Sequence, residues 1–335
     1  MKKLLNVSTH GRDLETIGDD WKRAADFAAD NAFDGFELYP VDGYDFARIP
    51  ADIVAGVHLR FIPVIEAIWH DDRVRLLQTF GDEDAIQLFY GGLDRSAVID
   101  GYRRQLALAA QFGAEYVVFH VSQCELEHVF DWSCPWSWQQ TTDLIADVVN
   151  AFTADTPYAG LILFENLWWP GSMRLDTPAE ITYLLERVTY PRCGIVLDTG
   201  HLLNKNQALR TEAEGIDYIL DAVAGLGDLR QTIHGVHLTC SLSGKYVIQS
   251  RQIEQPFAGC ESFWDRFSLA IDHIGKIDRH DPFTDPRIAR LFDLIDPEFL
   301  VFEFSYQDMA EWKAKVTRQK QALAARFWPV NSDKS

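Results

Sequence analysis

The sequence predicts a (β/α)8 TIM barrel with extended loops on its C-terminal face, and a single repeated pattern carries the prediction. A short β-branched or aromatic run ends in a polar residue, a helix-like stretch follows, and the unit recurs eight times. Such runs are typical of parallel strands that are buried on both faces. They are residues 4–8, 35–39, 56–62, 116–121, 161–165, 194–198, 233–238 and 300–304. We therefore expect one barrel domain over residues 1–335.

The stretches between the runs carry apolar residues at helical spacing. They are residues 21–31, 99–112, 142–152, 179–188 and 216–226. One helix start is marked by Thr177 at the N-cap, Pro178 in the first turn and Glu180 closing a capping box. A doubly wound open sheet is the main rival fold. No glycine-rich phosphate or dinucleotide motif follows the first run, which favours the closed barrel.

Two segments are longer than a barrel needs, residues 67–94 and 241–276. A third, residues 130–138, is shorter and aromatic. All three follow the C-terminal end of a predicted strand, where loops of a barrel surround the active site. Long loops there are often functional, so we expect the first two to be lid elements. The tail, residues 330–335, is expected to fray.

Composition narrows the classes of function. The chain has 50 acidic and 31 basic residues, a formal net charge of −19, and 47% hydrophobic residues. These are globular proportions, and the acidic balance argues against an extended nucleic-acid footprint. No apolar run approaches the roughly 20 residues that span a bilayer, and the N-terminus turns polar too soon for a signal peptide. The five cysteines form no C-x-x-C pair, so we expect a cytoplasmic protein without disulfides or a membrane partner.

Potential metal ligands stand at or near the ends of the predicted strands. They are His58, His120, Glu165, Asp198, His201, His237 and Glu303, and the loop before the last strand adds Asp278 and His280. Strand ends of a barrel converge on one mouth. Histidine and carboxylate side chains together are ligands for Zn²⁺, Mn²⁺ and similar divalent ions. The pattern therefore indicates a metal site at the mouth.

Structural roles are the alternative for each of these residues. A lone histidine such as His58 can be an ordinary core residue, and Asp198 can cap a helix that carries His201 at the surface. Asp278 and His280 can be solvated loop residues. Glu165 and Glu303 are harder to explain in this way, because a carboxylate after an apolar run is costly to bury unless it is paired or bound to metal. Tryptophans near the mouth, Trp168 among them, can pack or form a wall for a sugar ring.

The order Glu165, Asp198-x-x-His201, His237 and Glu303 resembles the xylose isomerase-like barrel superfamily, which includes sugar phosphate isomerases and epimerases, hydroxypyruvate isomerase and endonuclease IV. The loop Asp278-Arg279-His280-Asp281-Pro282 is similar to the Arg-His loop of that group, although the Gly-Glu-Gly element that usually follows is absent. In the isomerase and epimerase branch the resemblance implies one metal held by Glu165, Asp198, His237 and Glu303. In the endonuclease IV branch it implies several zinc ions that also use His58, His120, His201, Asp278 and His280.

The first functional interpretation is a divalent-metal-dependent isomerase or epimerase of a small sugar, keto-sugar or polyol. A bound Mn, Zn, Co or Mg ion would stabilise an enediolate while Glu165 and Glu303 move the proton. Substrate-binding residues would be His58, His120, His201, Arg279 and Trp168.

The second interpretation is a multi-zinc phosphodiester hydrolase similar to endonuclease IV, with a small substrate better suited to an acidic surface than DNA. The third is a barrel that keeps a metal for structure or senses a sugar without catalysis. The sequence leaves open whether the chain forms a homo-oligomer.

Overall fold

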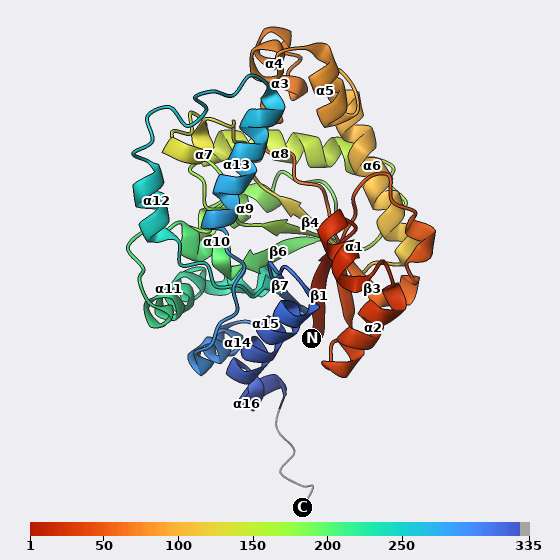
Figure 1. Cartoon of the computed structure of the whole chain (residues 1–335), viewed down its shortest axis with the longest axis vertical. Coiled ribbons are helices and arrows are strands. Elements are labelled where there is room, and N and C mark those ends of the chain that lie inside the picture. The colour runs from red at the N-terminus through yellow and green to blue at the C-terminus, as the bar shows by residue number, and fades with distance from the viewer. Residues whose placement is uncertain (329–335) are drawn as a thin grey trace, which may run out of the picture.

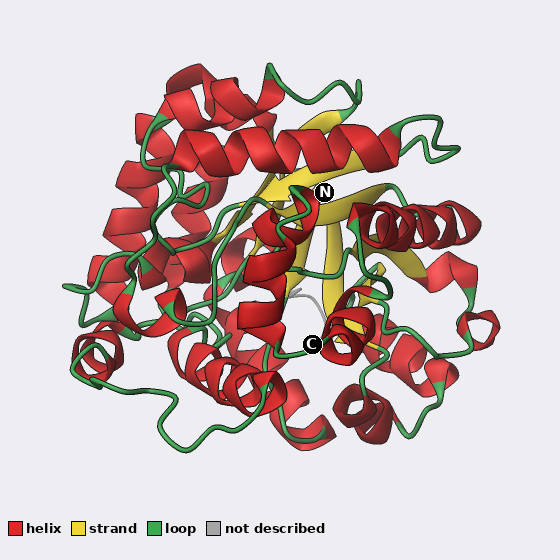
Figure 2. Cartoon of the chain, turned by 90° about the horizontal axis from the view of Figure 1, so that it is seen from above, coloured by secondary structure: helices red, strands yellow, loops and turns green. Residues whose placement is uncertain are grey.

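The repeated unit folds into a closed parallel barrel. The structure, a computed structural model, describes residues 1–328, so the tail expected to fray lies outside the described residues. The eight strands pair in chain order and the last pairs back with the first, which excludes the open sheet. Figure 2 shows the strands enclosed by helices. The strands are β1 (Lys2–Ser8), β2 (Gly35–Tyr39), β3 (Val54–His58), β4 (Tyr116–His120), β5 (Leu161–Glu165), β6 (Cys193–Asp198), β7 (Ile233–His237) and β8 (Phe299–Phe302).

Helices cover the outside of the barrel and fill the long loops. They are α1 (Gly11–Ile17), α2 (Trp21–Asp30), α3 (Glu66–Trp69), α4 (Arg73–Phe80), α5 (Glu83–Tyr90), α6 (Arg95–Phe112), α7 (His128–Asp131), α8 (Trp138–Thr153), α9 (Pro178–Leu185), α10 (Thr199–Asn204), α11 (Glu212–Gly225), α12 (Gly244–Ser250), α13 (Phe263–Ile277), α14 (Leu291–Leu294), α15 (Met309–Ala322) and α16 (Ala324–Phe327). Short 3-10 helices are η1 (Phe46–Arg48), η2 (Ala51–Ile53), η3 (Gly227–Thr232) and η4 (Pro286–Arg290). The predicted capping box is present at α9, where the Glu180 carboxylate accepts the Thr177 backbone N–H at 3.0 Å.

Four predicted strands are too long at their C-terminal ends, the fourth and seventh by one residue and the third and eighth by more. The third ends at His58 because the chain then leaves the sheet, and the Arg60 backbone N–H donates to the Gln105 side chain at 2.7 Å. The eighth ends at Phe302, so Glu303 is the first residue beyond it. The two larger differences place His58 at the end of β3 and Glu303 just beyond β8, so both predicted ligands lie at the barrel rim.

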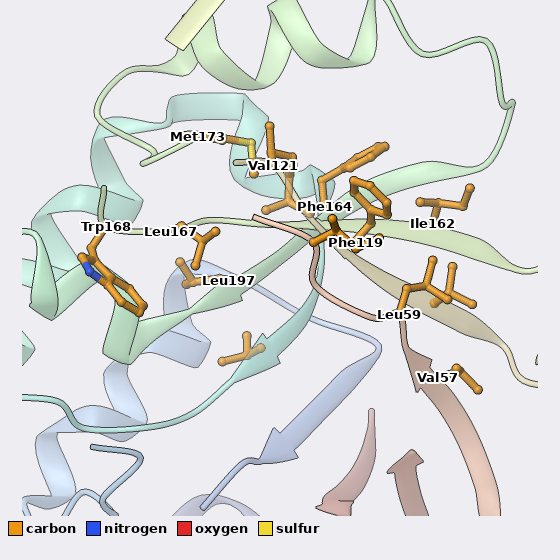
Figure 3. Packing of buried hydrophobic residues seen from close by; sticks show 14 of the residues in the cluster. Val57, Leu59, Phe119, Val121, Ile162, Phe164, Leu167, Trp168, Met173 and Leu197 are labelled. Atoms are coloured by element: carbon orange, nitrogen blue, oxygen red, sulfur yellow. The ribbon is translucent and has the colours of Figure 1, made fainter. Parts of the chain in front are cut away.

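Side chains alternate between the barrel interior and the helical layer, as the period of a strand requires. The interior is filled by an apolar cluster of Leu4, Tyr116, Val118, Leu163, Val196, Phe299 and Val301. The opposite faces of the same strands carry Val57, Phe119, Phe164 and Leu197 into the larger core (Figure 3). Four members of the apolar cluster are followed two residues later by a potential ligand that also points inward. These ligands are His120, Glu165, Asp198 and, just beyond β8, Glu303.

The two long insertions meet above the C-terminal face. The first contains α4 and α5, and the second contains α12 and nearly all of α13. Figure 1 shows one end of α13 beside α3 and α4. The rings of Phe80 in α4 and Phe263 in α13 lie 4.2 Å apart between centroids, and the Arg266 guanidinium donates to the Thr79 carbonyl. Helix α13 also rests on α7, where the Phe130 and His273 rings stack at 4.2 Å. These contacts hold α13 across the mouth of the barrel.

Within residues 1–328, no helix combines the length and the apolar character needed to cross a membrane.

Candidate metal centre

The predicted ligands gather at the C-terminal rim of the barrel. His58, His120, Glu165, Asp198 and His237 are the last residues of β3 to β7, and Glu303 follows β8. Glu165, Asp198 and His237 are at most 1% exposed, whereas the Glu303 side chain is 18% exposed. The barrel thus holds a group of charged side chains almost out of contact with water.

Within residues 1–328, four sets of residues each offer ligand atoms that all lie within 4.8 Å of one another. They are His58, His120 and Glu165; Glu165, Asp198, His237 and Glu303; Asp198, His201 and His280; and Glu37, His58 and His237. Glu165, Asp198, His58 and His237 each belong to two sets. Histidine nitrogens and carboxylate oxygens in such sets are the donors that zinc and other borderline divalent ions prefer.

Three of the histidines are anchored through one ring nitrogen. A backbone carbonyl can only accept a hydrogen bond, so His58 Nδ1 donates to Leu59 O at 3.0 Å and His201 Nδ1 donates to Asn166 O at 2.8 Å. His237 Nε2 lies 3.0 Å from Glu37 Oε2. The other nitrogen of each ring faces the carboxylates of the cluster. Metal-ligating histidines in proteins have this arrangement, because the anchored N–H fixes the tautomer and the ring orientation.

Several polar atoms of the cluster are buried and make no hydrogen bond within the described residues, namely His120 Nδ1, Asp198 Oδ2, His237 Nδ1 and His280 Nε2. Two of them are nevertheless close to an oxygen. His237 Nδ1 lies 2.9 Å from Glu303 Oε2, and His280 Nε2 lies 2.8 Å from Asp278 Oδ2. Short separations without hydrogen-bond alignment are expected of donors whose lone pairs point at a common ion. Buried polar atoms otherwise cost free energy when they lack a partner.

The electrostatics of the cluster follow from burial and alternating charge. Burial raises the pKa of Asp198 to about 7, with Glu165 and Asp278 adding to the rise and His201 opposing it. Burial opposes ionisation of Glu165 too, but His120 and His237 outweigh it and hold its pKa well below the usual range. In the same way His237 and His280 overcome burial and hold the pKa of Glu303 at about 2. Neighbouring histidines thus keep Glu165 and Glu303 charged at neutral pH.

The outer part of the cluster directly follows the second insertion in the chain. Asp278 is the C-cap residue of α13, and its Oδ2 lies 3.1 Å from His201 Nε2. His280 adopts a left-handed backbone with φ 47°, a conformation that costs free energy in a non-glycine residue. The flanking backbone is fixed, because the Arg279 N–H donates to Ser241 Oγ at 3.0 Å and the Cys240 N–H donates to Asp281 O at 2.7 Å. Asp278 and His280 are therefore built into the cluster and are not solvated loop residues.

Asp198 and His201 combine a structural and a site position. Asp198 Oδ1 accepts the His201 N–H at 2.6 Å and caps α10, while Oδ2 stays without a hydrogen bond. The His201 side chain is 5% exposed, so the alternative of a surface histidine is wrong. Asn166 ties the pair to β5, because its side chain bonds the backbone of Asp198 in both directions, at 2.9 and 3.0 Å.

Glu37 is a site residue that the sequence reasoning missed. It lies in the middle of β2, is fully buried, and accepts hydrogen bonds from Asn6 Nδ2 at 3.0 Å and Tyr116 Oη at 2.8 Å as well as from His237. The sequence did carry one signal, a carboxylate within an apolar run, but Glu37 does not stand at the end of its run as Glu165 does. Since its hydrogen bonds are directed at its neighbours, Glu37 orients His237 from beneath.

A cavity of about 340 Å³ opens above the cluster. Trp168 and Trp169 are 2% exposed and line it, and the Trp168 ring centroid lies 4.8 Å from that of His201. Trp132, Trp136 and Trp138 do not line it. Arg279, predicted to bind substrate, also does not: its side chain is 54% exposed and its guanidinium pairs with Asp281 at 3.0 Å. The Arg279 side chain leaves the cavity because the left-handed turn at His280 directs the histidine inward instead.

Comparison with known proteins agrees with the fold. A family model described as the xylose isomerase-like TIM barrel matches residues 25–285. No curated protein sequence gives a significant match. Endonuclease IV from Thermus thermophilus is a similar solved structure, 13% identical with a TM-score of 0.54, over 97% of this chain and 100% of that chain. The 3-keto-D-glucoside 4-epimerase from E. coli is 13% identical with a TM-score of 0.50, over 96% of this chain and 98% of that chain. At such identities the similarity is one of fold.

Proposed function

The chain belongs to the xylose isomerase-like TIM barrel family, and from this premise we propose that it is a multinuclear metal-dependent hydrolase of a small phosphodiester. The observation that carries the proposal is the number of ligand sets. An isomerase of this family would need the set of Glu165, Asp198, His237 and Glu303. Here the His58 and His120 set adjoins it through Glu165, and the His201, Asp278 and His280 group adjoins it on the other side.

The residues present fit divalent ions. The donors are histidine nitrogens and carboxylate oxygens, three histidines are anchored through the opposite nitrogen, and buried donor atoms are left without hydrogen bonds. Ions held there would supply Lewis acidity, neutralising charge on phosphoryl oxygens and making water acidic enough to attack at neutral pH.

Hydrolysis then consumes one water molecule. Its oxygen forms the new P–O bond as the P–O bond to the leaving group breaks, and its proton ends on the leaving oxygen. Glu303 lines the cavity and, at 18% exposed, is the most exposed carboxylate of its set, so it is placed to accept a proton and pass it on. Trp168 and Trp169 exclude bulk water from the floor of the cavity, which strengthens the electrostatic interactions there.

The metal-dependent isomerase or epimerase is the second candidate, because one set is complete by itself. Glu165, Asp198, His237 and Glu303 lie together and include two carboxylates that could remove and return a proton. In that reaction His58, His120 and His201 would bind substrate oxygens rather than metal.

Replacing His120 separates the two candidates. In the hydrolase, His120→Ala removes a ligand, so the bound metal per chain and the rate of bis(4-nitrophenyl) phosphate hydrolysis should both fall. In the isomerase, His120→Ala leaves the metal content unchanged. His234→Ala is the matched control, because His234 pairs with Glu298 at 2.8 Å away from the cluster. An unchanged metal content in His120→Ala, with epimerisation of a keto-sugar, would overturn the proposal in favour of the second candidate.

A further inference from the structure

The cavity changes character between its floor and its walls. The floor is made by the ligand cluster, whereas most of the residues above it are apolar. Its volume of about 340 Å³ lies at the lower end of the range of small-molecule sites. A substrate that fills it must therefore present different chemistry at its two ends.

Helix α13 forms one wall with a single apolar face. Phe267, Ala270, Ile271 and Ile274 line the cavity, and their spacing of three and four residues places them on one side of a helix. Ile271 is 50% exposed, so it stands where the cavity opens to solvent. The helix is held in this position by Phe263, whose ring packs on Phe80 at 4.2 Å and on Phe89 at 5.4 Å.

Aromatic and aliphatic side chains form the facing wall, with Phe61 and Trp169 at its centre. Their rings are close to parallel, with an interplanar angle of 22° and centroids 6.4 Å apart. Leu126 and Val129 also line the cavity. Flat apolar surfaces of this kind favour an aromatic ring, which gains stacking in addition to burial.

Two polar groups in these walls have partners within the protein, whereas Trp169 Nε1 is buried and makes no hydrogen bond within the described residues. The Arg60 guanidinium donates to the Phe89 carbonyl at 2.8 Å and lies over the Phe89 ring at 5.4 Å. Cys124 Sγ donates to Glu125 O at 3.4 Å. Sugar hydroxyls placed between the walls would give up water and gain few partners, which is unfavourable. A polynucleotide is disfavoured by the net charge of −19 and by the roof that α13 forms over the cavity.

We infer that the substrate is amphiphilic: its phosphodiester binds at the floor, and an aromatic group attached to it occupies the apolar chamber between α13 and the Phe61–Trp169 wall. This inference rests on the proposed hydrolase function and names its substrate class.

Two diesters with one leaving group test the chamber. The metal-loaded protein is assayed with 1-naphthyl 4-nitrophenyl phosphate and with methyl 4-nitrophenyl phosphate, so that only the retained group differs. Burying one face of a naphthyl ring should raise kcat/KM by about tenfold or more over the methyl diester. Equal kcat/KM values for the two diesters would overturn the inference.

A charged side chain introduced at the cavity opening tests whether the naphthyl preference arises in this chamber. Ile271→Asp should remove most of the naphthyl preference, because it places a carboxylate against the ring. The matched control is Ile248→Asp in α12, which is 43% exposed and does not line the cavity, and it should keep the preference. Loss of the preference in both variants, or in neither, would contradict the assignment to this chamber.

Binding separates this inference from the proposed function. If neither diester is hydrolysed, the proposed function fails, and calorimetry with 1-naphthyl phosphate and methyl phosphate then decides the chamber alone. Tighter binding of the naphthyl compound that is lost in Ile271→Asp upholds the chamber, and equal binding of the two compounds overturns it.

Discussion

The barrel interior has two layers that differ in chemistry although the same strands supply both. Val118, Leu163 and Val301 pack in the lower layer, and two positions further along each strand stand His120, Glu165 and Glu303 in the upper layer. The lower layer is apolar and fully buried, with the Tyr116 and Phe299 rings 4.3 Å apart. The upper layer holds charged groups whose buried atoms include several without hydrogen bonds.

The difference shows how one fold separates stability from chemistry. Apolar burial in the lower layer favours folding, whereas the crowded carboxylates of the upper layer are costly to bury unless they are neutralised. Because one strand runs through both layers, a substitution in the upper layer can be matched with a substitution in the lower layer only two residues away.

The largest effect is expected for Glu165→Gln. Glu165 belongs to two ligand sets, so both the metal content and the activity should fall, the activity by about a hundredfold to a thousandfold, as for other groups that stabilise transition-state charge. Elemental analysis and a steady-state assay on the same preparation check this. Full metal content in the variant would count against Glu165 as a ligand.

Leu163→Ala should instead lower the stability of the protein and leave its metal content unchanged. Removing a fully buried leucine side chain two residues before Glu165 should lower the free energy of unfolding by about 2–5 kcal/mol. Metal content per folded chain should stay the same, since no ligand is changed. Denaturant unfolding and elemental analysis measure the two quantities, and a loss of metal would show that the layers are not separable.

A smaller effect is expected for Glu37→Gln, between the two layers. Glu37 accepts from His237 Nε2 and from Tyr116 Oη, and a positioning carboxylate of this kind is worth about 10–100-fold in metal affinity. Tyr116→Phe is the control, because it removes one hydrogen bond to Glu37 and leaves His237 anchored. Metal affinity measured against a competing chelator should fall in the first variant and hold in the second; equal affinities would remove the positioning role.

The smallest effect is expected for Arg279→Ala. The side chain is half exposed and its ion pair with Asp281 lies outside the cavity, so stability should change by less than about 0.5 kcal/mol and activity by less than about twofold. A large loss of activity would instead restore the substrate-binding role that the motif predicted for it.

Much of the fold and of the metal centre could be predicted because both leave local patterns in the sequence of each strand. Buried parallel strands leave continuous apolar runs, and Glu165 and Asp198 stand out at the ends of theirs. Glu37 lacked this signal of position, because it lies within β2 and reaches His237 only across the closed barrel.

The roof over the cavity was also beyond the sequence pattern. The insertion of residues 241–276 was predicted as a lid element, but its position depends on the pairing of Phe80 with Phe263, two residues far apart in the chain. Side-chain direction was the remaining difficulty. Arg279 and His280 are neighbours in one motif, and only the backbone turn at His280 decides which of them faces the cluster.

The most direct test of the multinuclear centre is the metal content of the unaltered protein. Elemental analysis would be made on protein purified without chelator and without metal-affinity resin, with metal reported per chain. More than one divalent ion per chain is the predicted result, because the ligand sets extend on both sides of Glu165, Asp198, His237 and Glu303. A single ion per chain that remains in His120→Ala would contradict the account and favour the isomerase or epimerase.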